Sequence, residues 1–173
     1  MTDEQRRIRS YLQGQGAKLS PAEIVDKVRA AMGQLHEAAV GVPPARFAER
    51  PAPEEWSANE VLAHVVEAGR LFGNAITRIL EGRAAETLRD EAARDTSPRT
   101  LEQLWTLLQR DRATLFERVL RADPAQRLEA TVEHPMFGPL NWREALLFMR
   151  LHDLDHAGQL QNVADAFAAV SPS

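Results

Sequence analysis

The stretch from Asn141 to Phe167, NWREALLFMRLHDLDHAGQLQNVADAF, decides the fold. An apolar residue recurs at every third or fourth position, which predicts one long amphipathic helix. Residues four apart lie one above the other on a helix, so His152 and His156 stack within its apolar face. That face contains Ala145, Met149, His152, His156, Leu160, Val163 and Phe167.

Buried imidazoles need polar partners, because burying a polar group without one costs roughly 2–7 kcal/mol. A metal ion would meet this need, since each neutral ring offers it a nitrogen lone pair. His152 and His156 supply only two ligands. The pair therefore predicts a third ligand from another part of the chain.

Capping signals predict where three helices begin. Ser20, Ser57 and Asn141 are each followed three residues later by a glutamate, the spacing of a capping box. Four amphipathic helices bury their apolar faces most simply against one another, so the sequence predicts an all-α four-helix bundle. The expected helices run from Ser20 to about Val40, Ser57 to about Gly82, Ser97 or Thr100 to Ala122, and Asn141 to Phe167.

The segments around these helices carry weaker patterns. Residues 3–15 are expected to form a short polar helix or a frayed arm, broken by Gly14 and Gly16. Residues 83–96 are charged and rich in alanine, and a loop or a loose extra turn is expected there. No segment is expected to form a strand. The predicted division is an N-terminal arm over 1–19, the bundle over 20–169 and a tail over 170–173.

The composition restricts the classes of function. At 173 residues the chain is expected to form one domain, and it contains no cysteine, so any thiol chemistry needs an external thiol. A net charge of −4 gives no general attraction to nucleic acid or to anionic lipid. The N-terminus has no apolar signal segment, and no apolar run reaches the length of a membrane span. A cytoplasmic protein with neither a nucleic-acid nor a membrane partner is expected.

His64 is the best candidate for the third ligand. It lies in the second predicted helix at the border of an apolar face, and bundles build metal sites from side chains on facing helices. His64, His152 and His156 would leave coordination positions open for water or substrate, which is typical of catalytic sites. Zinc, nickel, cobalt and iron all suit such ligands, with zinc or nickel favoured.

The other polar residues near these positions are interpreted more simply. His36 is expected to be structural or exposed, and His134 is expected to be a loop histidine that could line the mouth of a pocket. Asp153 and Asp155 either support the site electrostatically or are surface charges opposite Arg150, and the second interpretation is favoured. Gln159 is a candidate to support a ligand or to line the pocket. Glu60 is expected to be a capping residue.

Three motifs resemble one known family. They are Trp56-Ser57 before the helix that carries His64, the HP-x-x-G turn from His134 to Gly138, and the ending His152, His156 and Gly158-Gln159. Together they resemble the DinB-like (DinB/YfiT) superfamily of metalloenzymes, over about residues 20–168. In the last motif Ala157 stands before Gly158, a small departure from the family pattern.

This resemblance implies a four-helix bundle in up-down-down-up order, with a divalent metal on His64, His152 and His156. It also implies a homodimer. Characterised members of the superfamily include metal-dependent transferases of low-molecular-weight thiols, such as bacillithiol or mycothiol, and related maleylpyruvate isomerases. The resemblance assigns no catalytic residue beyond the three metal ligands.

Three hypotheses about function remain open at this point. The first is a metal-dependent enzyme with a small-molecule substrate, either a thiol S-transferase or a hydrolase. The second is a non-catalytic protein that binds a metal or a small ligand. The third is a purely structural bundle whose histidines are core residues.

Overall fold

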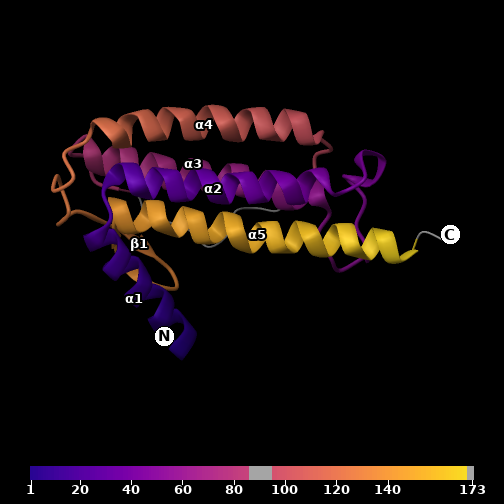
Figure 1. Ribbon diagram of the computed structural model, residues 1–173, viewed down its shortest axis with the longest axis horizontal. Helices are drawn as coiled ribbons and strands as arrows, with labels where there is room; N and C mark the ends of the chain where they lie inside the picture. The colour runs from indigo at the N-terminus through magenta and orange to yellow at the C-terminus, as the bar shows by residue number, and fades with distance from the viewer. Residues whose placement is uncertain (86–94, 171–173) are drawn as a thin grey trace.

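A computed structural model of the chain describes residues 1–85 and 95–170. Four long helices run side by side, and a shorter N-terminal helix leaves the bundle at an angle (Figure 1). The elements are α1 (Asp3–Lys18), α2 (Pro21–Val40), the short 3-10 helix η1 (Pro44–Arg46), α3 (Ala58–Leu80), α4 (Leu101–Arg121), β1 (Thr131–His134), β2 (Gly138–Asn141) and α5 (Trp142–Val170).

Side-chain caps fix the start of each helix of the bundle. Ser20, Ser57 and Thr100 each accept a hydrogen bond from the backbone N–H three residues on, and the side chain of that residue accepts one from the backbone N–H of the cap residue. Asn141 caps α5 by accepting from the backbone N–H groups of Arg143 and Glu144. Each such cap stabilises a helix by about 1 kcal/mol. The predicted helix starts are confirmed.

Two buried clusters define the direction of the four helices. One joins the C-terminal halves of α3 and α4 to the N-terminal halves of α2 and α5, and the other joins the opposite halves. Consequently α2 and α5 run in one direction and α3 and α4 in the other. The chain is a four-helix bundle in up-down-down-up order, as predicted, with α5 packed between α2 and α3.

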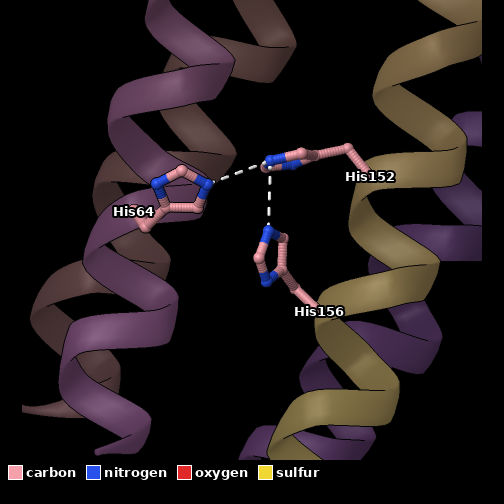
Figure 2. Close-up of side chains that lie close together, drawn as sticks. All are labelled: His64, His152 and His156. Carbon is pink, nitrogen blue, oxygen red and sulfur yellow. Dashed lines mark hydrogen bonds between the residues drawn. The ribbon is translucent and has the colours of Figure 1, made fainter. Parts of the chain in front are cut away.

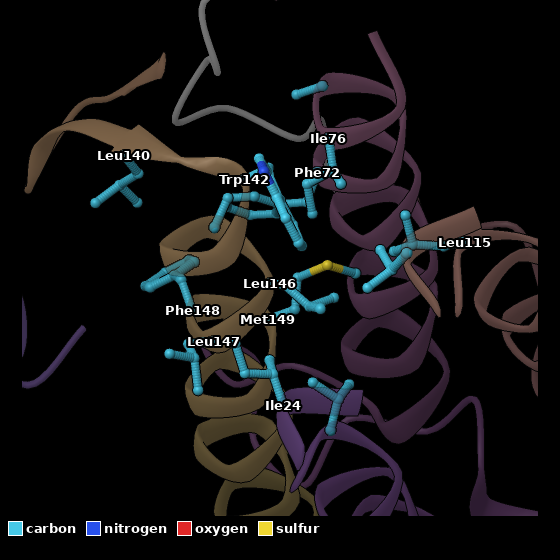
Figure 3. Close-up of a cluster of buried hydrophobic side chains, with 14 of the residues drawn as sticks. Ile24, Phe72, Ile76, Leu115, Leu140, Trp142, Leu146, Leu147, Phe148 and Met149 are labelled. Carbon is cyan, nitrogen blue, oxygen red and sulfur yellow. The ribbon is translucent and has the colours of Figure 1, made fainter. Parts of the chain in front are cut away.

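The larger cluster surrounds the start of α5. Trp142, Leu146 and Phe72 lie within it (Figure 3). The indole N–H of Trp142 donates to the backbone oxygen of Gln126 over 2.7 Å, so this fully buried ring has its polar group satisfied. Burying one large apolar side chain contributes roughly 1.5–3 kcal/mol, so this cluster anchors the end of the bundle that precedes the histidines.

The short helix expected from residue 3 does form, but the predicted break at Gly14 and Gly16 is wrong, because α1 continues through both glycines to Lys18. Its Leu12 is fully buried, and the hydroxyl of Tyr11 contacts Arg150 of α5 over 3.1 Å. A Cβ on Gly16 would lie only 3.1 Å from the Cγ of Glu144, so this glycine permits close packing on α5 rather than ending the helix.

The expectation that no strand would form is also wrong. β1 and β2 form an antiparallel hairpin in which Thr131 pairs with Asn141 and His134 with Gly138. Gly138 has a φ of +70°, a conformation that favours glycine, and so allows the tight turn. Strands of four residues show too little alternation to be recognised in a segment rich in turn-forming residues.

Two predictions fall largely outside the described residues. They are the loop or extra turn at 83–96, of which 86–94 are not described, and the tail, of which 171–173 are not described. No helix in the described ranges is long and apolar enough to cross a membrane.

Candidate metal centre

Three histidines converge in the seam between α3 and α5. His64 extends from the second turn of α3, and His152 and His156 extend from successive turns of α5 (Figure 2). The Nε2 of His152 lies 3.2 Å from the Nε2 of His64 and 3.1 Å from the Nε2 of His156. Three ring nitrogens therefore face one point. We call His64, His152 and His156 the histidine cluster.

Gln159 fixes the orientation of one ring. Its Oε1 lies 2.8 Å from the Nδ1 of His156. An amide oxygen only accepts hydrogen bonds, so Nδ1 of His156 carries the hydrogen and its Nε2 keeps a lone pair. This is the tautomer that a metal ligand needs, and Gln159 is the partner that holds it.

His64 is held differently. The edge of Trp56 packs against its ring, with 5.6 Å between the ring centroids. Its Nδ1 is buried and has no hydrogen-bond partner. A hydrogen on this nitrogen leaves the lone pair on Nε2, the atom that faces His152.

Burial lowers the pKa of two members of the cluster. The pKa of His152 lies well below its usual value, first because of burial and then because of the neighbouring His156 and His64. Burial, followed by His156, also lowers the pKa of His64. Both rings are therefore neutral at pH 7 and have lone pairs to offer.

The spacing of the cluster suits a divalent cation. Zinc–nitrogen bonds of about 2.0–2.1 Å at tetrahedral angles separate ligating nitrogens by about 3.4 Å. The two separations from His152 are 3.2 and 3.1 Å, and the ligating atoms of all three residues lie within 4.8 Å of one another. His152 can donate at most one hydrogen from Nε2, so lone pairs accumulate at this point, and a cation would relieve their repulsion.

The comparisons with known proteins agree with this architecture. The family model described as the DinB superfamily matches residues 27–160. The chain belongs to the DinB superfamily. A crystal structure described as TT2238, a four-helix bundle protein, is similar with a TM-score of 0.63 and 25% sequence identity, over 83% of this chain and 99% of that chain. No functionally curated protein matches the sequence.

In this DinB-superfamily protein a buried ion pair lies beside the histidine cluster. Asp153 is fully buried and accepts a hydrogen bond of 2.8 Å from Nη2 of Arg112 on α4. The interpretation of Asp153 as a surface charge is therefore wrong, whereas Asp155 is exposed as expected. Burial raises the pKa of Asp153, and the facing guanidinium opposes that shift.

The sequence carried a signal for this pair. Arg112 continues the apolar stripe of α4 between Leu108 and Leu115, and Asp153 lies four residues from both Met149 and Ala157 on α5. Two opposite charges within two facing apolar stripes indicate a buried pair. Arg112 is the residue near the site that sequence reasoning missed.

His134 is buried rather than a loop histidine. It ends β1, and its ring packs between three phenylalanines at centroid distances of 4.5–6.0 Å, namely Phe72, Phe137 and Phe148. Its Nδ1 accepts from the backbone N–H of Met136 over 3.2 Å. Phe148 also contacts the ring of His152, so this aromatic group links the hairpin to the histidine cluster.

The remaining predicted residues lie away from the cluster. His36 packs against Trp105, with 4.5 Å between centroids, and both line a cavity of about 840 Å³ between α2 and α4. Glu60 caps α3 as predicted, and it also forms a 2.6 Å ion pair with Arg50. None of these residues contributes to the histidine cluster.

Substituting Gln159 is expected to weaken metal binding. Gln159→Leu has nearly the same volume but cannot accept from Nδ1 of His156, and losing such a support typically costs 10–100-fold in metal affinity. Zinc titration against a chromophoric chelator measures this. Gln161→Leu is the control, because the Gln161 side chain bonds to Asp165 on the exposed side of α5. Equal affinities for parent and Gln159→Leu would contradict the support assigned to Gln159.

The stability of the metal-free protein is expected to fall with pH below about 6.5. Histidine titrates near 6.5 in an unfolded chain, but the pKa values of His152 and His64 are lowered in the folded state. At a pH between the lowered pKa values of the folded state and 6.5, the unfolded chain binds more protons than the folded protein does. Unfolding therefore becomes easier as pH decreases. Calorimetry in a chelator from pH 7.5 to 5.5 checks this, and His152→Asn should flatten the dependence. An equally steep dependence in His152→Asn would count against this cause.

Proposed function

We propose that this protein is a metal-dependent enzyme in which His64, His152 and His156 bind one divalent cation, zinc or nickel. The observation that carries the proposal is the approach of their Nε2 atoms to within 3.1–3.2 Å on either side of His152. Membership of the DinB superfamily supports it further.

A divalent ion on three neutral ligands keeps its full charge and lowers the pKa of a bound thiol or water. The protein's own residues prepare that position. Gln159 directs the lone pair of His156 inward, burial keeps His152 and His64 unprotonated, and Trp56 packs against the ring of His64. Three protein ligands leave room for the reacting molecule.

We further propose that the nucleophile is an external low-molecular-weight thiol. The chain has no cysteine, so it offers no thiol of its own. In the proposed S-transfer the thiol gives up its proton and its sulfur forms a bond to an electrophilic carbon. The group displaced from that carbon leaves with the bonding electron pair. Products are a thioether and the protonated leaving group.

Metal analysis and a thiol assay test this proposal together. Protein purified without a histidine tag is expected to contain close to one divalent ion per chain. With zinc or nickel restored, it should conjugate 1-chloro-2,4-dinitrobenzene faster with a cellular thiol than His152→Ala does. Turnover of an ester with no thiol present would favour a hydrolase instead, and protein that takes up no ion would rule out both.

A non-catalytic role as a metal- or ligand-binding protein is the second candidate. One observation favours it: the carboxylate of Asp153, the residue after His152, is hydrogen-bonded to Arg112 in the core, which disfavours a role as a general base. Metal bound in full, with no turnover of any electrophile or ester, would support this second candidate.

A further inference from the structure

The Arg112–Asp153 pair lies where the two apolar clusters of the bundle meet. Arg112 follows Leu108 of one cluster and precedes Leu115 of the other. The two side chains are 3% and 0% exposed. Nε and Nη1 of Arg112 and Oδ2 of Asp153 have no hydrogen-bond partner. The pair is a polar contact enclosed in the core.

Stability alone does not account for such a contact. Removing two charges from water costs several kcal/mol each, and replacing a buried pair with apolar residues of similar volume is often neutral or stabilising. What a buried polar contact can add is a unique arrangement, as a single buried polar residue sets the register of a coiled coil. The question is which arrangement this pair fixes.

The position of the pair indicates that it fixes the rotation of α5. Asp153 directly follows His152, and its partner Arg112 comes from α4, whose backbone approaches α5 less closely than those of α2 and α3 do. The guanidinium also lies against Gly69 of α3. Arg112 therefore contacts both helices that carry the histidine cluster.

Metal binding requires the rotation of α5 to place its histidines accurately. Side-chain ends lie about 5–6 Å from a helix axis, so a rotation of about 10° moves them by about 1 Å. Metal–ligand distances tolerate about 0.2 Å. Apolar stripes pack acceptably over a wider range of rotation, since hydrophobic contact is not directional. A directional bond on the residue next to His152 restricts rotation in a way that the apolar core does not.

We propose that Arg112 and Asp153 are positioning residues of the histidine cluster, whose bond holds α5 at the rotation that turns His152 and His156 toward His64. This inference rests on the proposed metal site. It does not make either residue a metal ligand. The role of the pair is to set the geometry of the site rather than to stabilise the bundle.

Two double variants test the inference, with zinc as the probe. Arg112→Met/Asp153→Leu removes the directional bond and fills the space with apolar atoms. The melting temperature of its metal-free form is expected to lie within about 5 °C of the parent's, with zinc affinity at least tenfold weaker. Arg112→Gln/Asp153→Asn retains a hydrogen-bonded link without charge, and its zinc affinity is expected to stay within about threefold of the parent's. Leu115→Ala, three residues from Arg112, controls for general loosening of the core.

The inference would be overturned if the Met/Leu variant bound zinc as tightly as the parent does. It would also be overturned if the Gln/Asn variant lost as much zinc affinity as the Met/Leu variant. If the Met/Leu variant does not fold, the Gln/Asn variant still decides. A metal-free crystal structure of either variant gives a second measurement. The separation of the Nε2 atoms of His64 and His152, 3.2 Å in the parent, should widen in Met/Leu and persist in Gln/Asn. A parent protein that binds no zinc would refute the metal site. An unchanged distance between the Nε2 atoms of His64 and His152 in the Met/Leu variant would refute the positioning role.

Discussion

Alanine at position 152 is expected to abolish the thermal stabilisation that zinc gives to the parent protein. His152 lies between the other two ligands, so its loss leaves His64 and His156 without the central nitrogen. A ligand at a hundred times its dissociation constant stabilises the folded state by about 2.7 kcal/mol. For a chain of this size that corresponds to a rise in melting temperature of about 5–11 °C.

Thermal unfolding with zinc and with excess chelator measures this effect. The parent should lose the whole increment in chelator, and His152→Ala should melt at the same temperature in both solutions. His36→Ala is the matched control, because His36 is another partly buried histidine on a helix but lies outside the cluster. A zinc-dependent rise in His152→Ala equal to that of the parent would exclude the three-histidine site.

Removing only one partner of the buried pair is expected to be the most destabilising of these substitutions. Arg112→Met leaves the carboxylate of Asp153 without its hydrogen-bonding partner in a fully buried position. Breaking such a pair typically costs 3–5 kcal/mol, a large part of the roughly 5–15 kcal/mol that stabilises a domain. The melting temperature should fall by about 6–20 °C.

Urea unfolding of the metal-free proteins gives the corresponding free energies. The control is Arg121→Met, because Arg121 pairs with Glu117 at the surface, where both side chains are more than half exposed. Exposed pairs contribute about 0–1 kcal/mol, so this variant should unfold almost as the parent does. If Arg112→Met lowered the free energy of unfolding by less than about 1 kcal/mol, Asp153 would not depend on Arg112 as its buried partner.

The starts of the bundle helices were predictable because a cap is a local signal. Ser20 and Ser57 act through residues three positions away, within reach of a short sequence window. The approach of His152 and His156 was predictable for the same reason, since one turn of helix separates them. His64 is 88 residues from His152, and the two were connected in advance only by the need for a third ligand and by the family resemblance.

Asp153 was misinterpreted because a single helix does not show what its neighbours offer. A charged residue beside a histidine is more often solvated than buried, and the partner Arg112 lies 41 positions away. The glycines of α1 were misinterpreted for a similar reason. Gly16 reduces helix propensity locally, but packing of α1 on Glu144 of α5 favours the absence of a side chain there.

The pairing of α2 with α5 has a consequence during synthesis on the ribosome. These two helices pack against each other along the bundle, yet they are its first and last helices in chain order. A nascent chain that ends before Trp142 lacks the helix that packs between α2 and α3, so their apolar faces stay open to chaperones and to other chains. His152 and His156 emerge later still. The histidine cluster therefore cannot assemble until α5 has left the ribosome as far as His156.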